Sequence, residues 1–205
     1  MSKRYPSKYL IGLTGNIAVG KSLVRETLAQ LGAAAIDADL VAHQVIRRGG
    51  AAYDDIIAAF GAGILADDGE IGRAALGEIV FADPAKLKQL EGITHPAIRR
   101  RIDQLIRATD ARVAVIEAIK LLEGDLKNAV DSVWVVDAPR EAQRKRLISQ
   151  RGMTEADAAS RIALQNSQAD KLRQADVIIR NDGNIEETRA QVGRAWRAIP
   201  SHRRV

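Results

Sequence analysis

The sequence predicts an α/β fold, with helices on both faces of a five-stranded parallel sheet, from two observations. Short apolar runs alternate along the chain with longer stretches of helical periodicity, which is the pattern of βαβ units. Apolar residues make up 46% of the 205 residues, but aromatic residues make up only 3%. Ala, Ile, Leu and Val must therefore fill the core, as expected where helices pack on a buried sheet.

The first strand is expected at 9–14, and the segment directly after it, Gly15–Ser22, reads G-x-x-x-x-G-K-S. Glycines at both ends of this loop allow backbone angles that other residues avoid. Consecutive N–H groups can then face a phosphate chain at the positive end of the following helix. In this pattern Lys21 reaches the β- and γ-phosphates, and Ser22 is a ligand of Mg²⁺. The order of strand, loop and helix therefore predicts a nucleoside triphosphate site.

The remaining core elements are strands and the helices that connect them. Apolar residues recur at helical spacing over 23–31, and Gly32 ends that helix. The predicted strands are 9–14, 33–36, 113–116, 133–136 and 177–179.

From about 41 to 109 the pattern is mainly helical and predicts no strand. A direct crossover between strands needs only about a dozen residues, so this much helix indicates an insertion with a task of its own. A helical substrate-binding subdomain is the simplest interpretation. We therefore expect a single domain over 1–205. Its parts are a core at about 8–45, 110–150 and 174–199, a helical insertion at about 46–109 and a lid at about 151–173.

The lid is a predicted helical hairpin rich in arginine. Pro139 suits the first turn of a helix that Gly152 ends, and Thr154 with Asp157 forms a capping-box pattern at the start of the second helix. The arginines of the two helices are Arg144, Arg146, Arg151 and Arg161. Closure of such a hairpin would keep water away from a transferring phosphoryl group.

The last helix is expected to follow the capping residue Asn184 and to end at Pro200. The apolar residues expected to face the core are Ile185, Val192, Trp196 and Ile199. The segment 201–205 is expected to be a frayed basic tail.

Charge and composition limit the partners. The chain carries 31 Lys and Arg against 26 Asp and Glu, a formal net charge of +5 that favours anionic partners. The basic residues are scattered among acids without interleaved aromatics, which favours small phosphates over nucleic acid. The sequence has no cysteine, no signal-peptide pattern and no apolar stretch near the roughly 20 residues that span a bilayer. We expect a cytoplasmic protein, a monomer or small homo-oligomer, that binds neither nucleic acid nor a membrane.

Three strands end beside an acid or an amide, at Glu117, Asp137 and Asn181. Open parallel sheets bind ligands at the carboxyl ends of their strands, so these residues are candidates for a site. For Asp137, which precedes Ala138-Pro139, a role in the turn is favoured.

The class of nucleotide-binding protein can be narrowed. A GTPase should add a D-x-x-G segment at a strand end and an N-K-x-D segment, and the sequence contains neither. Helicase-type ATPases normally need a longer chain and several acids at a strand end, where this chain has Glu117 alone. These absences narrow the choice toward a small kinase.

Together these segments resemble the dephospho-CoA kinases, and the resemblance covers nearly the whole chain. It rests on Leu13-Thr14-Gly15 entering the loop, Ile36-Asp37-Ala38-Asp39, His95-Pro96, Gln165, and A-D-V-I-I-R-N at 175–181. The resemblance implies the P-loop kinase fold, a three-layer α/β/α arrangement with a helical acceptor-binding insertion and a helical lid.

The implied reaction transfers the γ-phosphoryl group of ATP to the ribose 3′-hydroxyl of dephospho-CoA, giving CoA and ADP in the last step of CoA biosynthesis. Mg²⁺ is the implied cofactor. Asp39 matches the family's proposed base, because a nearby carboxylate could orient the hydroxyl and accept its proton while Lys21 offsets phosphate charge. Alternatively, Asp39 complements the dipole of the helix that begins near Leu40. Asp37 could hold Mg²⁺ through a water or only form the turn.

The expected site residues fall into two groups. The ATP-binding group is Gly15, Asn16, Ile17, Ala18, Val19, Gly20, Lys21, Ser22, Leu23, Arg144, Arg151 and Asn181. The acceptor-binding group is Asp39, His95 and Glu117. Structural alternatives stay open, since a lone histidine is often structural, helical arginines are usually solvated, and Asn181 could serve only the turn before Gly183.

The loop departs from the family pattern, which usually reads G-G-I-G-S-G-K. Asn16, Ala18 and Val19 stand at three of its small positions. Only Gly15 and Gly20 are expected to carry a strong backbone requirement, so function should survive.

The segment after the third strand, Glu117–Glu123, also departs from the family pattern. It keeps two acids, but the family's proline is absent and Lys120 adds a charge, which affects the expected acceptor contacts. Two alternatives to the main hypothesis are another P-loop nucleoside or nucleotide kinase, and an ATP-dependent switch protein without kinase activity.

Overall fold

The computed structural model describes residues 5–119, 121–123 and 125–203, and the chain divides into two compact units. The first unit is Met1–Ile36 with Thr109–Val205, and the second is Asp37–Ala108. The second unit thus begins earlier than the expected insertion and includes Asp37, the last residue of the second strand, and Asp39.

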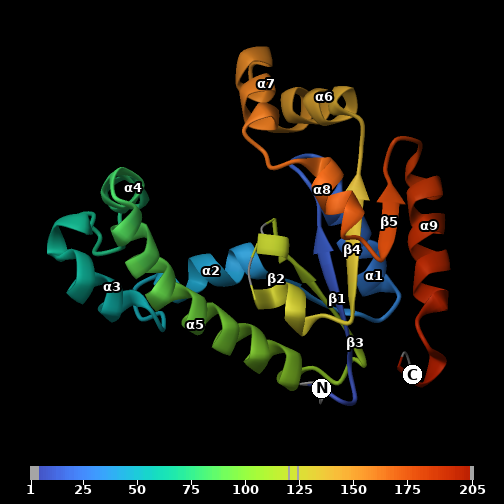
Figure 1. Ribbon diagram of the computed structural model, residues 1–205, viewed down its shortest axis with the longest axis horizontal. Helices are drawn as coiled ribbons and strands as arrows, with labels where there is room; N and C mark the ends of the chain where they lie inside the picture. The colour runs from blue at the N-terminus through green and yellow to red at the C-terminus, as the bar shows by residue number, and fades with distance from the viewer. Residues whose placement is uncertain (1–4, 120, 124, 204–205) are drawn as a thin grey trace. The chain divides into compact units, whose positions relative to one another are not determined.

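A five-stranded sheet with the order β2-β3-β1-β4-β5 forms the centre of the first unit (Figure 1). The strands are β1 Tyr9–Thr14, β2 Ala34–Asp37, β3 Val113–Glu117, β4 Ser132–Asp137 and β5 Val177–Arg180. β1 pairs in parallel with β3 and β4, and β4 pairs in parallel with β5. The predicted strands are confirmed to within one residue at each end, and the loop that follows β1 lies between the carboxyl ends of β3 and β4.

Helices cover this sheet and extend beyond it. They are α1 Lys21–Gln30, α6 Arg140–Arg151, α7 Glu155–Ala163, α8 Gln168–Arg173 and α9 Ile185–Ala198. α1 and α9 pack against each other and the sheet, α8 lies against β4, and α6 with α7 forms a hairpin beyond the carboxyl end of β4 (Figure 1). The α/β fold predicted for the chain, with helices packed on a five-stranded sheet, is confirmed.

Two predicted helix caps are present. The Thr154 side chain accepts a hydrogen bond from the N–H of Asp157 at the start of α7, and Asn184 does the same for Glu187 at the start of α9. Such bonds satisfy N–H groups that the first turn of a helix leaves without partners.

The core of the first unit consists of aliphatic residues and two tryptophans. β1, β3 and β4 contribute most of the sheet side, and α1 and α9 cover it with Val24, Leu28, Val192 and Trp196. Ile185 was expected to face this core, but it is 51% exposed because it is the first residue of α9.

The predicted frayed tail is wrong for the residues that can be described there. Residues Ser201–Arg203 form a short 3₁₀ turn, and Arg203 Nη1 donates to the carbonyl oxygens of Pro6 and Lys8, the latter at 3.0 Å.

Two further 3₁₀ turns lie between β3 and β4, at Leu121–Glu123 and Asp125–Ala129.

The second unit is helical. Its helices are α2 Ala38–Ile46, α3 Tyr53–Phe60, α4 Arg73–Ala82 and α5 Pro84–Ala108, with a 3₁₀ turn at Ala62–Ile64. α5 packs against the other three helices. One antiparallel bridge joins Leu65 to Ile71, but the elements assigned within Asp37–Ala108 are helices, as predicted. Among the residues with described structure, no helix combines the length and apolar character needed to cross a membrane.

Candidate functional site

The loop after β1 has the backbone shape that its motif predicts. Gly15 and Gly20 have φ angles of 148° and 100°. A Cβ atom on Gly15 would lie 2.5 Å from the Val136 carbonyl oxygen, and one on Gly20 would lie 1.9 Å from Nδ2 of Asn181. Both glycines are therefore required by backbone angle and by space.

Ala18 also has a left-handed backbone, with φ of 58°. The expectation that the strong backbone requirement falls on Gly15 and Gly20 alone is therefore incomplete. An L-residue in this conformation costs roughly 1–2 kcal/mol, which contacts around the loop must offset.

Lys21 lies folded back along the loop. Its Nζ donates to the carbonyl oxygens of Gly15 at 3.0 Å and Asn16 at 3.2 Å, so its positive charge is held beside the loop. Ser22 and Leu23 follow in the first turn of α1, where Ser22 is exposed.

Arg146 and Asn181 support the second half of the loop. Arg146 Nη1 donates to the carbonyl oxygens of Ala18 at 3.0 Å and Val19 at 3.1 Å, while Nη2 donates to that of Asn181 at 2.9 Å. Asn181 Nδ2 donates to the Val19 carbonyl at 2.8 Å, and its Oδ1 accepts from Thr188 Oγ1 at 3.1 Å. Desolvation by burial lowers the pKa of the Arg146 guanidinium. The side chains of Arg146 and Asn181 thus hold the loop backbone.

Two glutamines support the first half of the loop. Gln165 lies in the segment 164–167, which we call the strap because it joins α7 to α8, and Gln168 is the first residue of α8. The N–H of Asn16 donates to Gln168 Oε1, and the N–H of Ile17 donates to Gln165 Oε1, both at 3.2 Å. Gln168 Nε2 in turn donates to Asp137 Oδ1 at 3.0 Å and to the Val136 carbonyl at 2.9 Å. Gln168 therefore joins the loop to the end of β4, with Asp137 as its partner.

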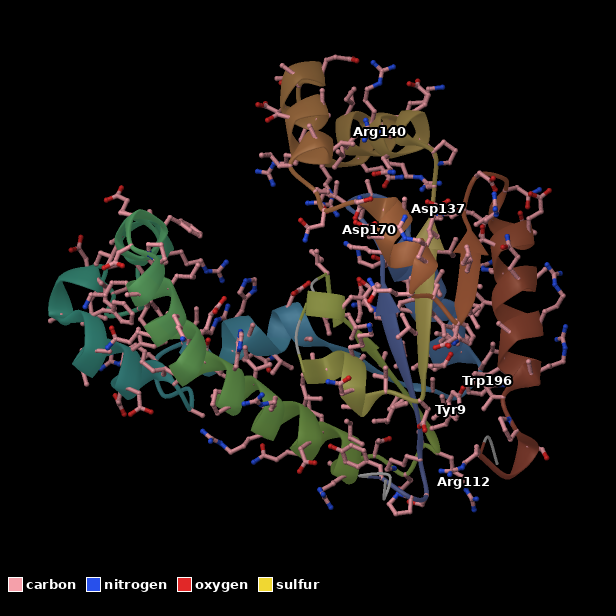
Figure 2. All side chains as sticks on the ribbon, viewed as in Figure 1. Tyr9, Arg112, Asp137, Arg140, Asp170 and Trp196 are labelled. Atoms are coloured by element: carbon pink, nitrogen blue, oxygen red, sulfur yellow. The ribbon has the colours of Figure 1, made fainter. Side chains whose placement is uncertain are left out.

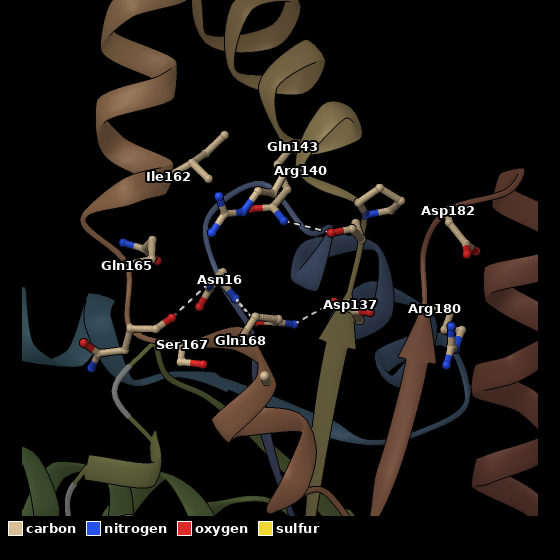
Figure 3. Close-up of a pocket in the computed structure, with 14 residues that line it drawn as sticks. Asn16, Asp137, Arg140, Gln143, Ile162, Gln165, Ser167, Gln168, Arg180 and Asp182 are labelled. Atoms are coloured by element: carbon tan, nitrogen blue, oxygen red, sulfur yellow. Dashed lines mark hydrogen bonds between the residues drawn. The ribbon is translucent and has the colours of Figure 1, made fainter.

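A pocket of about 600 Å³ lies beside the loop, at the carboxyl ends of β4 and β5. The strap, the start of α6 and the segment at the end of β5 line it, and Figure 3 shows Gln168 hydrogen-bonded between Asn16 and Asp137. Figure 2 places Asp137 and Arg140 near the end of β4. The volume is in the range that encloses a small ligand such as a nucleoside.

One buried polar atom lines this pocket without a protein partner. Gln143 is 4% exposed, and its Nε2 donates to the Ala138 carbonyl at 2.8 Å. Its Oε1 has no hydrogen-bond partner among the described residues. An unpaired buried acceptor has a free-energy cost, which a ligand donor could relieve.

The lid arginines differ in their surroundings. Arg144 pairs with Glu141 Oε2 at 2.8 Å and with Glu155, so it joins α6 to α7. Arg151 and Arg161 are exposed, at the end of α6 and on α7. Arg140 is the arginine of α6 that lines the pocket, and the sequence did not single it out.

Glu117 ends β3 in the first unit and is 9% exposed. Its Oε2 lies 3.2 Å from Nη1 of Arg25, which reaches it from α1. An opposite charge at this distance stabilises the buried carboxylate. Lys120, the charged departure after this strand, lies outside the described residues.

The other predicted residues belong to the second unit. Asp37 is the N-cap of α2, where its Oδ1 accepts from the N–H of Leu40 at 2.9 Å. Asp39 is an exposed residue in the first turn of that helix, and His95 is an exposed residue of α5. The helix α2 packs against α5 within this unit.

Sequence reasoning missed Arg25, Gln168 and Lys171, which contact Glu117 and the loop. The signal for Gln168 was a second glutamine three residues after Gln165, in a segment short enough to be a connection. Arg25 and Lys171 gave no such signal, because a basic residue on a helix is usually solvated.

Comparisons with known proteins identify relatives across nearly the whole chain. A model of the family described as dephospho-CoA kinase matches residues 9–187. The chain is 45% identical over 194 residues to a dephospho-CoA kinase of Symbiobacterium thermophilum, covering 92% of this chain and 80% of that protein. It is 42% identical over 198 residues to a dephospho-CoA kinase of Moorella thermoacetica, covering 95% and 93%.

Solved structures of kinases also align with this chain. A dephospho-CoA kinase from Campylobacter jejuni aligns with a TM-score of 0.67 at 30% identity, covering 94% of this chain and 97% of that one. A shikimate kinase from Bacteroides thetaiotaomicron aligns with a TM-score of 0.53 at 15% identity, covering 92% and 96%. The second likeness concerns the fold alone.

Proposed function

This chain belongs to the dephospho-CoA kinase family, and on that premise we propose that it transfers the γ-phosphoryl group of ATP to the ribose 3′-hydroxyl of dephospho-CoA. The acceptor in this proposal rests on the family match over residues 9–187. The observation that supports ATP as the donor is the phosphate loop, with the Lys21 ammonium bonded along it and a nucleoside-sized pocket beside it. We expect the reaction to occur in the cytoplasm, where ATP is supplied, and the enzyme to be a monomer or small homo-oligomer.

The donor half of the site lies in the first unit. We place the triphosphate on the N–H groups of Ala18 to Leu23, at the positive end of α1, with Lys21 turning from the loop carbonyls toward the phosphates. The nucleoside would then occupy the pocket, between the strap and Arg140. Arg144, which joins the lid helices, would act on ATP by holding the hairpin together as it closes.

The residues present fit a magnesium ion. Mg²⁺ is held by one or two protein oxygens together with phosphate oxygens and water, and Ser22 offers an exposed hydroxyl in the first turn of α1. Asp37 would contribute through a water, in addition to capping α2. Bound there, Mg²⁺ would offset charge on the β- and γ-phosphates.

The acceptor half combines a base and residues that hold the substrate. Asp39 is an exposed residue in the first turn of α2. The carboxylate would accept the 3′-hydroxyl proton as the oxygen bonds to the γ-phosphorus and the bond to the ADP oxygen breaks. His95 and Glu117 would contact the acceptor, with Arg25 orienting Glu117.

A panel of acceptors tests this function. ADP release from Mg²⁺-ATP would be measured with dephospho-CoA, shikimate, adenosine and AMP, using Lys21→Met as the inactive control. Of these four acceptors, we expect only dephospho-CoA to give rapid ADP release. Faster release with another acceptor, or a rate that dephospho-CoA does not change, would overturn the proposal.

A further inference from the structure

The side chain of Asn16 makes contacts that a smaller residue at this position of the loop could not make. Asn16 is 7% exposed, and both ends of its carboxamide are bonded. Its Nδ2 donates to the carbonyl oxygen of Asn166 in the strap at 3.1 Å, and its Oδ1 accepts from Nζ of Lys171 at 2.9 Å. A loop residue is therefore bonded to both the strap and α8 through its side chain.

Lys171 is a buried cation close to a site for anions. It is 5% exposed and lies on α8, directly after the strap. A buried ammonium group has a high desolvation cost unless oxygen atoms surround it. Asn16 Oδ1 is one such oxygen, and the Ile119 carbonyl at 3.5 Å is a second, longer contact.

Asn16 lies between two ammonium groups. Lys21 Nζ donates to its backbone carbonyl at 3.2 Å, and Lys171 Nζ donates to its side chain at 2.9 Å. Its N–H is held by Gln168. Every polar group of Asn16 thus has a partner, so its orientation at the entrance of the loop is fixed.

We propose that Asn16 and Lys171 form a positioning pair that holds the phosphate loop in its phosphate-binding conformation and ties the first half of the loop to the strap and to α8. Lys171 acts through Asn16, whose side-chain oxygen accepts a hydrogen bond from its ammonium group. The proposal rests on the proposed function only in that the loop binds the phosphates of a nucleotide.

A mutant cycle tests the pair. The variants are Asn16→Ala, Lys171→Met and the double variant, with Lys171→Arg as the conservative replacement. Arg173→Met is the matched control, because it removes one positive charge from the same helix α8 at an exposed site whose partner is Asp170. The readouts are the Kd of ADP by calorimetry, the KM for ATP, kcat and the unfolding temperature.

Each single variant should weaken ADP binding and raise the ATP KM about tenfold, which matches the loss of one hydrogen bond to a charged group. The double variant should also lose about tenfold rather than a hundredfold, since the two residues act as one unit. Lys171→Arg should restore ADP affinity to within about threefold, and Arg173→Met should change nothing.

Additive losses in the double variant would overturn the proposal. So would ADP affinity that stays at the wild-type value while the unfolding temperature falls, because that is the result of a purely structural role. If Lys171→Met does not fold, Asn16→Ala and Lys171→Arg still decide the matter. ADP binding needs no acceptor, so a wild-type protein that binds ADP but fails to phosphorylate dephospho-CoA would refute the proposed function and leave the pair untouched.

Discussion

Replacement of Gly20 by alanine tests how the loop and the end of β5 fit together. The residue has φ of 100°, and a Cβ atom there would lie 1.9 Å from Nδ2 of Asn181. The left-handed backbone costs an L-residue roughly 1–2 kcal/mol. Displacing Asn181 would break its bonds to Val19 and Thr188, each contributing about 1 kcal/mol. Gly20→Ala should therefore lower the free energy of unfolding by about 3–4 kcal/mol.

The contribution of Asn181 can be separated from that of the backbone. Asn181→Ala alone should cost about 2 kcal/mol, since it removes the same two bonds. The double variant should then be no less stable than Gly20→Ala, which gives a coupling of about 2 kcal/mol. Urea unfolding followed by tryptophan fluorescence suits this test, because Trp134 and Trp196 are the two tryptophans and both belong to the first unit.

Two results would refute this reasoning. The first is a Gly20→Ala protein within about 0.5 kcal/mol of wild type, which would mean that the loop accepts a side chain there. The second is a double variant that loses about 5–6 kcal/mol, the sum of the single effects, which would mean that Asn181 is not displaced.

Asp39→Asn should bind ADP within about twofold of wild type but lose at least a hundredfold in kcat, as expected for loss of a general base; unchanged turnover would exclude that role. Arg144→Ala should raise the ATP KM about threefold because it releases α6 from α7. Arg151→Ala, at an exposed position, should raise the ATP KM less; an ATP KM no higher for Arg144→Ala than for Arg151→Ala would assign Arg144 to the solvated surface. Chelation with EDTA should abolish turnover until Mg²⁺ is added in excess, and turnover that persists in EDTA would remove Ser22 from its assigned role.

The sheet could be predicted because its signals are local. Each strand is a short apolar run bounded by glycine or polar residues, and the strand positions agree to within one residue. The caps at Thr154 and Asn184 were equally local, since a capping side chain bonds to a backbone group three residues away. The prediction that Ile185 faces the core was wrong because helical periodicity does not show at which residue the buried face of a helix begins.

The supports of the phosphate loop could not be predicted in the same way. The motif identified Lys21 and Ser22, but Gln168, Lys171 and Arg146 reach the loop from segments more than a hundred residues away along the chain. Their roles depend on burial and on contacts made only by the folded chain, which a helical pattern of basic and amide residues does not reveal.

The assignment of the reaction is tested most directly by the product formed from dephospho-CoA and Mg²⁺-ATP. Mass spectrometry and ³¹P NMR should find one added phosphate, carried by the ribose 3′-oxygen, in an amount equal to the ADP released. ADP release without phosphorylated dephospho-CoA, or a phosphate on another oxygen, would contradict the account.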